Sequence, residues 1–142
     1  TPSKLTYLAG ALRELARYRS PAFTLLADDD REAVASRLLL AFVANGQYCG
    51  GRMHVAPAAR QDDGAFDLVT IDDVGLLRAL PKLARLYLGN LLRDPLVQHR
   101  LVNRVCITAE PVAGIEADGQ FVGRTPTVIS VERGALRTLR GP

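Results

Sequence analysis

The stretch Asn45–Asp67, NGQYCGGRMHVAPAARQDDGAFD, decides how the rest of this 142-residue chain is interpreted. It opens on Asn45-Gly46, the dipeptide that best fits a type I′ hairpin turn, in which both central residues have positive φ. The glycine pair Gly50-Gly51 follows, and then an apolar run. The segment Gln61–Gly64 next places two carboxylates on a glycine turn, just before a strand-like run begins. An ordinary hairpin does not need this much glycine and acid together, so the stretch is a candidate functional site.

The composition is that of one globular domain. Hydrophobic residues make up 48% of the chain and charged residues 23%, which excludes general disorder. No apolar run reaches the roughly 20 residues of a membrane span, and the N-terminal sequence lacks the basic and then apolar pattern of a signal peptide. We therefore expect a single cytoplasmic domain over residues 1–142. Because the chain begins at Thr1 rather than Met, a piece of a longer protein is one interpretation.

The charge pattern argues against a nucleic-acid partner. The net charge is only +3, and the arginines are spread along the chain rather than clustered. A mild, scattered basic excess suits either an anionic membrane surface or plain solubility. Cys49 and Cys106 lie far apart in strand-like sequence, with no Cys or His at metal-ligand spacing. We expect both to be reduced, half-buried thiols.

The first third of the chain predicts a helix and two strands. Leucines at three- and four-residue steps predict an amphipathic helix over residues 3–19, which packs on a sheet or faces a lipid or a partner. Ala22–Ala27 has the pattern of a short strand. Asp28–Asp30 predicts a solvated acidic turn, because neighbouring side chains on an extended chain do not converge on a cation. Ser36–Ala44 is nearly all apolar, which is typical of a strand covered on both faces.

The middle of the chain alternates between strand and helix patterns. Phe66–Ile71 predicts a strand, and a leucine-rich helical region is expected to start at Asp72. Pro81 does not fit a helix interior, so we expect a short helix, a break, and a second helix to about Leu92. The leucines cover more than one stripe, which fits either a buried crossover helix or a flap beside an apolar ligand or a second domain. Asp94–Leu101 is expected to be connecting structure.

From residue 102 onward the pattern is again β. Short runs are interrupted by Gly, Pro and Asp-Gly at regular intervals, which indicates a sandwich or a compact antiparallel assembly. Asp118-Gly119 is a second strong hairpin signal. The predicted fold class is therefore mainly β with flanking helices.

Several short motifs are candidates for chemistry. Asp62-Asp63-Gly64 is either a Mg²⁺ site, built from a carboxylate and converging backbone carbonyls, or an ordinary turn. Asp118-Gly119-Gln120 carries a carboxylate that either serves as a general base toward a hydroxyl or only closes a hairpin. Gly50-Gly51-Arg52 has the groups to hold a phosphate, although two glycines and an arginine are a common combination. His54 and His99 are isolated and are interpreted as structural or surface residues.

The order of these pieces resembles the C-terminal domain of the diacylglycerol kinase-like lipid kinases, a group that includes sphingosine kinases and bacterial lipid kinases. The matching segments are CGGRMHVAPAA, DDGAFD and DGQ. The family has a glycine run, A-P-x-A, D-G-x-x-D and a later D-G-E in this order. The resemblance covers essentially the whole chain. It implies a β-sandwich-like C-terminal domain of the NAD kinase/diacylglycerol kinase-like fold, and transfer of the ATP γ-phosphoryl group to a lipid hydroxyl such as that of diacylglycerol.

The resemblance also implies roles for particular residues. The side chain of Asp63, together with the backbone carbonyls of Arg60 and Ala65, would hold Mg²⁺. Asp118 would be the candidate base. Gln120 stands where the family has glutamate and cannot accept a proton as a carboxylate does. The enzyme would therefore be impaired or would rely on Asp118 alone.

The expected partners follow from the same resemblance. ATP is bound in the family by a separate N-terminal domain with a G-G-D-G-T motif, which this chain lacks, so the chain alone is expected to be inactive. Other expected partners are that domain, a lipid with a free hydroxyl, a peripheral membrane surface and a second copy in a homodimer. The leucines of residues 83–92 are candidates for the acyl-chain surface. Two alternatives are a non-catalytic lipid- or partner-binding module, which Gln120 favours, and kinship with NAD kinases, against which the leucine-rich helices argue.

Overall fold

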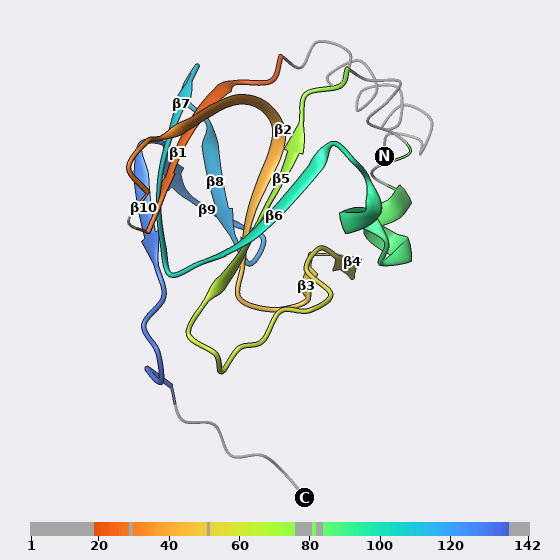
Figure 1. Ribbon diagram of the computed structural model, residues 1–142, viewed down its shortest axis with the longest axis vertical. Helices are drawn as coiled ribbons and strands as arrows, with labels where there is room; N and C mark the ends of the chain where they lie inside the picture. The colour runs from red at the N-terminus through yellow and green to blue at the C-terminus, as the bar shows by residue number, and fades with distance from the viewer. Residues whose placement is uncertain (1–18, 29, 51, 76–80, 82–83, 137–142) are drawn as a thin grey trace, which may run out of the picture.

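The protein is built mainly from antiparallel β-sheet (Figure 1). The computed structural model describes residues 19–136, apart from 29, 51, 76–80 and 82–83. One sheet has six strands in the order β10-β7-β1-β2-β5-β6, and two further sheets are the hairpins β3-β4 and β8-β9. The elements are β1 (Ala22–Ala27), β2 (Val34–Ala44), β3 (Tyr48–Cys49), β4 (Met53–His54), β5 (Phe66–Asp72), the 3₁₀ helix η1 (Leu91–Arg93), β6 (Val97–Val102), β7 (Arg104–Glu110), β8 (Gly114–Ala117), β9 (Gln120–Arg124) and β10 (Thr127–Ser130).

The large sheet is rolled, and the connection from β6 to β7 shows why. In the sheet order, β1, β2 and β5 lie between these two strands. In a flat sheet β6 and β7 would be about 19 Å apart, at about 4.8 Å for each neighbouring pair. A single residue, Asn103, joins them, and the two Cα–Cα steps from Val102 to Arg104 span at most about 7 Å. The edge at β6 must therefore curl back toward β7, which produces the sharp corner visible in Figure 1 and the β-sandwich-like domain.

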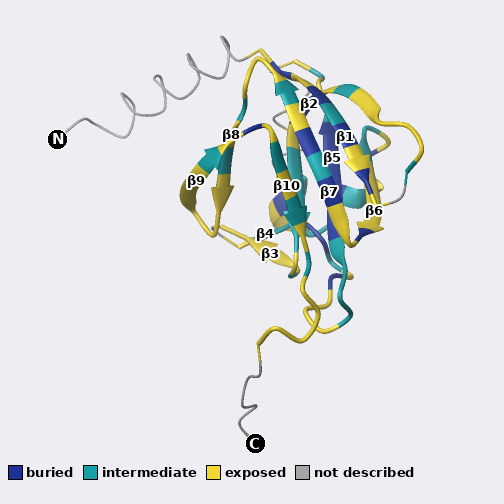
Figure 2. Ribbon diagram, turned by 90° about the vertical axis from the view of Figure 1, so that its left-hand side faces the viewer, coloured by how far each residue is buried: buried dark blue, intermediate teal, exposed yellow. Residues whose placement is uncertain are grey.

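The interior of the roll holds one of the two hydrophobic cores. Side chains from β1, β2, β5, β6 and β7 meet there, as expected for residues that alternate along each strand. Figure 2 shows the buried residues along these central strands. The members of this interior core are Phe23, Leu25, Ala27, Leu38, Leu68, Val102, Val105 and Ile107.

The second core lies on the outer face of β2 and β5. It is covered by the loop that precedes β5, by the helical residues 84–88 and by η1. The members of this outer core are Leu39, Val55, Ala56, Ala59, Val69, Ile71, Leu86 and Leu91. β5 is therefore buried on both faces, because Leu68 points into the roll and Val69 points outward.

The predicted strand of residues 36–44 is confirmed within β2, but it is covered on both faces only in part. Leu38 lies in the interior core and Leu39 in the outer core, whereas Leu40 is 38% exposed. The register with β5 slips between Leu38 and Leu40, as at a β-bulge. After the slip, Ala41 and Val43 pack against the interior core. Ordinary alternation along the strand supplies both cores, and the slip changes which positions face the interior, from Leu38 before it to Ala41 and Val43 after it.

Other strand predictions are confirmed. β1 spans the predicted residues, β5 extends the predicted strand to Asp72, and the Asp118-Gly119 turn joins β8 to β9. The prediction that Asp94–Leu101 is only connecting structure is wrong, because residues 97–102 form β6 and pair with β5. Polar side chains occupy the middle of β6, and an edge strand tolerates them because water reaches them.

The leucine-rich region differs from its prediction. The predicted helix start at Asp72 is wrong, because this residue ends β5 and the next residue donates a backbone hydrogen bond to the carbonyl of Arg37. Residues 84–88 are helical, and Gly89, with φ of 68°, stops that helix before Leu92. The first predicted short helix falls on residues 76–80, outside the described residues. The predicted helix of residues 3–19 also lies outside them, apart from its last residue.

Two local predictions are corrected. Asn45-Gly46 is not a type I′ turn, since neither residue has positive φ. Gly46 is instead close to another segment, because a Cβ there would lie 3.2 Å from the side-chain nitrogen of Gln61. Cys49 is exposed rather than half-buried, whereas Cys106 is intermediate, and both are free thiols.

The acidic turn after β1 is also bonded rather than simply solvated. Asp28 Oδ1 accepts hydrogen bonds from the backbone N–H groups of Asn103 and Arg104, at 2.7 and 2.9 Å. Asp30 forms a two-pronged ion pair with Arg100 at 2.9 and 3.0 Å. The loop is therefore tied to β6 and to the β6–β7 corner. No described helix has both the length and the apolar character that crossing a bilayer requires.

Candidate functional site

The Asp62-Asp63-Gly64 turn lies beside the β6–β7 corner. Asp63 is half-buried, and its Oδ1 accepts a hydrogen bond from the backbone N–H of Ala65 at 3.0 Å. The carbonyl of Gly64 accepts a hydrogen bond from Asn103 Nδ2 at 2.6 Å. The turn is therefore held in place by its own aspartate and by the residue that forms the corner.

Gly64 meets two separate requirements. Its φ of 75° lies in the left-handed region, which strains residues with a side chain. A Cβ at this position would also lie 2.9 Å from Cδ of Arg133, in the segment that follows β10. The glycine thus permits both the turn and the close approach of an arginine stem.

The oxygen atoms predicted for Mg²⁺ fit that ion in donor type. A carboxylate at Asp63 and backbone carbonyls at Arg60 and Ala65 are hard oxygen ligands, which magnesium prefers. In the described ranges, no three His, Cys, Asp or Glu side chains come together as a metal-binding group. An ion at this turn would therefore depend on the two carbonyls in addition to Asp63.

The side chain of Arg60 is engaged elsewhere. Its Nε lies 3.2 Å from Oδ1 of Asp62, and both side chains are mostly exposed. This hydrogen bond, with the attraction of the same carboxylate, raises the pKa of Arg60 above its ordinary value. The pairing fits the expectation that only the backbone carbonyl of Arg60 would serve a metal, and that Asp63 rather than Asp62 would be the side-chain ligand.

The second predicted element, the Asp118 turn, is on a different sheet. Asp118 and Gly119 have φ of 50° and 80°, as a type I′ hairpin turn requires. Gln120 begins β9 and pairs with Ala117 of β8. All three residues from 118 to 120 are exposed, and Figure 2 shows the hairpin standing beside the large sheet.

The structure does not bring the two predicted elements together. The Asp63 turn is attached to the β6–β7 corner, whereas the β8-β9 hairpin is joined to the large sheet by its two ends. Thr125 anchors those ends, since its N–H donates to the carbonyl of Ala113 and its hydroxyl accepts from the N–H of that residue. Within the described part of the chain, no hydrogen bond or ion pair links the two turns. A reaction centre that used both would need a further surface to close it.

A buried ionisable pair lies next to this region and was missed by the sequence interpretation. His99 Nε2 lies 2.6 Å from Oδ1 of Asp67, whose side chain is 3% exposed. The two residues are diagonal neighbours, because Asp67 pairs with Leu101 and His99 pairs with Val69. The available signal was an aspartate inside an apolar strand, since a buried carboxylate needs a partner. The sequence did not show that partner, because it lies on a strand that was not predicted.

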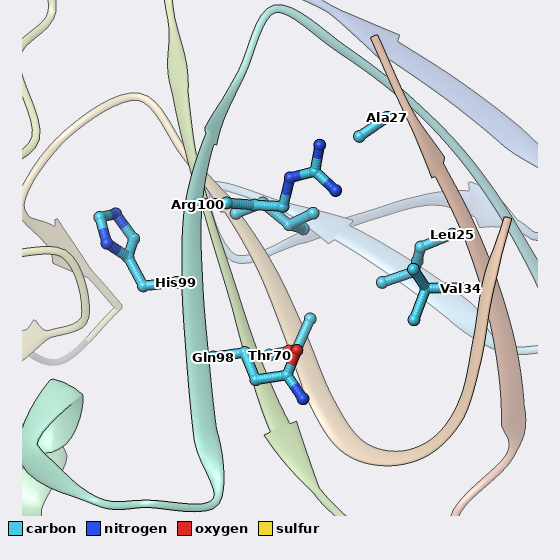
Figure 3. Close-up of a pocket in the computed structure, with 8 residues that line it drawn as sticks. Leu25, Ala27, Val34, Thr70, Gln98, His99 and Arg100 are labelled. Carbon is cyan, nitrogen blue, oxygen red and sulfur yellow. The ribbon is translucent and has the colours of Figure 1, made fainter. Parts of the chain in front are cut away.

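A small cavity opens at the mouth of the roll (Figure 3). It has a volume of about 100 Å³, roughly that of three water molecules in the liquid. Its floor is apolar and its rim carries Gln98 and Arg100, whereas His99 points away from it. Pockets for whole small ligands are usually about 300–1,000 Å³, so this cavity is too small for the chains of a diacylglycerol. The lining residues are Leu25, Ala27, Val34, Leu68, Thr70, Gln98, His99 and Arg100.

The ion pair of Asp30 with Arg100 closes one side of this cavity. The hydrogen bond from Arg100 lowers the pKa of Asp30, and the aspartate in turn raises the pKa of Arg100. Both groups are therefore charged across the whole neutral range. The pair holds the β1–β2 loop against β6 without offering a free charge to a ligand.

Comparisons with known proteins agree with the fold. The model of the YegS C-terminal NAD kinase beta sandwich-like domain matches residues 1–140. A crystal structure of a diacylglycerol kinase from Bacillus anthracis strain Sterne is similar at 22% identity and a TM-score of 0.67, with 93% of this chain and 44% of that chain covered. A second structure from that strain, attributed to the same activity, reaches a TM-score of 0.70 at 19% identity and covers 93% and 43%. A search of curated protein sequences found no match. The chain thus spans less than half the length of these solved structures.

Proposed function

This chain belongs to the family of the YegS C-terminal NAD kinase beta sandwich-like domain, and from that membership we propose that it is the lipid-side half of a diacylglycerol kinase-like lipid kinase. The reaction would transfer the γ-phosphoryl group of ATP to the hydroxyl of a diacylglycerol-like lipid. The family match over residues 1–140 is the observation that carries the proposal. The Asp63 turn supports it, because its donor atoms suit the metal that phosphoryl transfer uses.

In this proposal the Asp63 turn is the metal-binding part. The carboxylate of Asp63 and the carbonyls of Arg60 and Ala65 would hold Mg²⁺. A bound magnesium ion neutralises phosphate charge and orders the loop that carries it. The hydrogen bonds from Ala65 and Asn103 hold the turn in shape before any ion arrives, so little ordering entropy opposes binding.

Asp118 is proposed as the group that accepts the proton of the lipid hydroxyl. Its position at the exposed tip of a hairpin leaves the carboxylate open to a substrate that approaches from outside the domain. Gln120 lies two residues further along the exposed strand and can hydrogen-bond the lipid headgroup but cannot take its proton. Any proton transfer in this half of the protein therefore depends on Asp118.

The chain by itself is proposed to be inactive. Phosphoryl transfer needs a nucleotide site, and the sequence contains no glycine-rich phosphate-binding motif of the kinds that cradle ATP. The solved structures are more than twice as long as the part of them that this chain matches. We propose that a preceding domain of the same protein binds ATP, that residues 1–142 act as one lipid-side domain, and that the whole works on the cytoplasmic side of a membrane as a peripheral protein.

The decisive assay follows ATP-dependent phosphorylation of diacylglycerol in detergent micelles. A protein that includes the preceding domain is expected to be active, and Asp118→Asn is expected to lower its kcat by about 100-fold or more. The 142-residue chain is expected to give no product. Product from this chain alone, or no product from the longer protein with diacylglycerol, a sphingoid base or phosphatidylglycerol, would contradict the proposal.

The metal site has a separate test on the chain itself. Mg²⁺ that binds the folded state raises the Tm by an amount that grows with its concentration. Asp63→Asn is expected to abolish this rise. Asp62→Asn is the matched control, because Asp62 is the neighbouring carboxylate and is paired with Arg60 instead. Equal Mg²⁺ responses in both variants would show that the turn binds no specific ion.

Gln120 supports a second candidate function, a non-catalytic module that binds lipid or a protein partner. The glutamate of the family's D-G-E motif is replaced here by a neutral side chain, so the fold could persist without the chemistry. Gln120→Glu in the longer protein separates the two. A large gain in activity identifies a degenerate enzyme, whereas high activity already present with Gln120 shows that Asp118 or another group suffices.

A further inference from the structure

Three large side chains stand out from the surface near the candidate site. Tyr48 lies on the β3-β4 hairpin, and Tyr87 and Leu88 lie at the end of the helical residues 84–88. Their exposed fractions are 62%, 62% and 73%. We call these three residues the aromatic patch. Water solvates such surface poorly, and its clustering on a small domain marks an interaction site.

His54 connects the two segments of the patch. Its ring stacks on Tyr48, with the ring centroids 4.4 Å apart. The same ring lies against Gly89, the residue after Leu88, where a Cβ would come within 2.6 Å of His54 Nδ1. The hairpin and the end of the helix therefore pack together. The three exposed side chains therefore lie on two segments that are in contact with each other.

The charge around the patch is positive. The two segments that build it, with η1, carry Arg52, Arg85 and Arg93 against one aspartate, Asp94. That aspartate is buried and bonded to Arg85 at 2.7 Å, so it presents little negative charge to solvent. Arg52 and Arg93 are exposed. The net excess of the whole chain is only three, so a large share of it lies beside the aromatic patch.

A second exposed apolar surface has a different character. On the β8-β9 hairpin, Phe121 is 64% exposed and Val122 is 60% exposed. This hairpin carries Glu116 and Asp118 against Arg124, so it has no basic excess. It also lacks tyrosine, whose ring has an apolar body and a polar tip suited to a membrane interface. The two surfaces are similar in exposure but opposite in charge.

We propose that the aromatic patch is the face by which this chain docks on an anionic phospholipid bilayer. Leu88 enters the boundary between headgroups and acyl chains, the two tyrosines lie at headgroup level, and Arg52 and Arg93 contact lipid phosphates. The proposal rests on the lipid-kinase function proposed above, because it explains how the domain reaches a substrate whose chains remain in the bilayer. The cavity at the mouth of the roll is too small to take those chains out of it.

The test is co-sedimentation of the 142-residue chain with lipid vesicles. Vesicles of phosphatidylcholine mixed with phosphatidylglycerol are expected to bind the chain, pure phosphatidylcholine vesicles to bind it weakly, and added salt to release it. Leu88→Ser is expected to weaken binding at least about threefold. Arg52→Glu with Arg93→Glu is expected to weaken it at least about tenfold, because one basic residue near an anionic surface contributes about fivefold.

Matched controls come from the β8-β9 hairpin. Phe121→Ser removes a side chain as exposed as those of the patch, and Arg124→Glu reverses an exposed charge. Neither is expected to change vesicle binding. All of these positions are on the surface, so circular dichroism and Tm are expected to match those of the unaltered chain, which excludes misfolding as the cause.

Four outcomes would overturn the proposal: no binding to anionic vesicles, no loss with Leu88→Ser, an equal loss with Phe121→Ser, or self-association through the patch that Leu88→Ser abolishes. The last would identify a second copy as the occupant. Vesicle binding needs no catalysis. If the chain binds vesicles but the longer protein has no kinase activity, the proposed function is wrong and the proposed docking face stands. If the longer protein phosphorylates a soluble short-chain diacylglycerol but the chain does not bind vesicles, the docking face is wrong and the proposed function stands.

Discussion

Replacing His99 by alanine tests whether the buried carboxylate of Asp67 depends on a single imidazole. The two side chains are 2.6 Å apart, with 3% of Asp67 and 30% of His99 exposed. Asp67 shares its strand face with Val69 and Ile71, which belong to the outer hydrophobic core. A carboxylate in these surroundings needs a hydrogen-bond donor, and His99 is the cross-strand side chain that provides one.

The expected loss of stability follows from that geometry. Removing a hydrogen bond to a charged group costs about 1.5–3 kcal/mol, and leaving a fully buried charge without its partner costs about 3–5 kcal/mol. Because His99 is 30% exposed, its removal opens a path for water to the carboxylate. The lower range therefore applies, and His99→Ala should reduce the free energy of unfolding by about 2 kcal/mol. For a domain of this length that corresponds to a Tm lower by roughly 6 °C.

Urea unfolding of the two single variants and the double variant measures the interaction directly. Asp67→Asn keeps the shape and one oxygen acceptor, so it should cost only about 1 kcal/mol. The double variant should cost less than the sum of the two, because both changes remove the same contact. If His99→Ala costs under about 0.5 kcal/mol, or if the two changes are additive, Asp67 is stabilised by other groups and the reasoning fails.

Three further predictions concern the loops around the β6–β7 corner. Gly64→Ala should lower the free energy of unfolding by about 1–3 kcal/mol, because it adds backbone strain at φ of 75° and a close contact with Arg133. Adding Arg133→Ala to this variant should restore only the stability lost through the contact. Thermal unfolding of both variants measures these changes. The hydrogen bond from Arg100 lowers the pKa of Asp30, so the pair stabilises the fold above the ordinary carboxyl pKa and loses this contribution as the pH falls through the lowered one. An NMR titration should find that Arg100→Gln raises the pKa of Asp30, and an unchanged midpoint would exclude the pairing in solution. Asp28→Ala should lower the free energy of unfolding by about 2 kcal/mol, because two backbone N–H groups lose their acceptor. Asp28→Asn keeps an oxygen acceptor and should lower it less. Equal losses of stability in the two variants would contradict the geometry.

Strands were predicted correctly from the sequence where the pattern of apolar residues matches the burial of the strand. Ala22–Ala27 alternates between buried and more exposed positions. Phe66–Ile71 is apolar apart from Asp67 and Thr70 because the roll and the outer layer cover its two faces. Asp118-Gly119 specified a turn because few other residues accept its backbone angles. In these places the local pattern and the tertiary environment impose the same requirement.

The failures share a different cause. Residues 97–102 carry Gln98, His99 and Arg100 in succession, a pattern typical of a loop, yet they form a strand because β5 has a free edge for them to pair with. Asn45-Gly46 has the composition of a tight turn, but neither residue has positive φ, and Gly46 instead packs against the side chain of Gln61. In both cases the deciding partner is distant in sequence, so no local window contains the information.

In the Asp63 turn, some residues could be predicted from the sequence and others could not. The glycine and acidic residues of the Asp63 turn were visible in the sequence, but the group that fixes the turn was not. Asn103 donates its side-chain amide to the carbonyl of Gly64, its backbone N–H to Asp28, and accepts from the N–H of Val131, at 2.6, 2.7 and 2.9 Å.

One residue thus ties together the proposed metal-binding turn, the loop after β1 and the segment after β10. Asn103 occupies that position because it is the single residue between β6 and β7, where the rolled sheet brings three chain segments to one corner. A hydrogen-bonded path through Asn103 therefore joins the turn to the loop after β1, which also carries the Asp30 partner of Arg100. The site's chemistry can be read from its own residues, whereas its coupling to the rest of the domain is set by how the sheet closes.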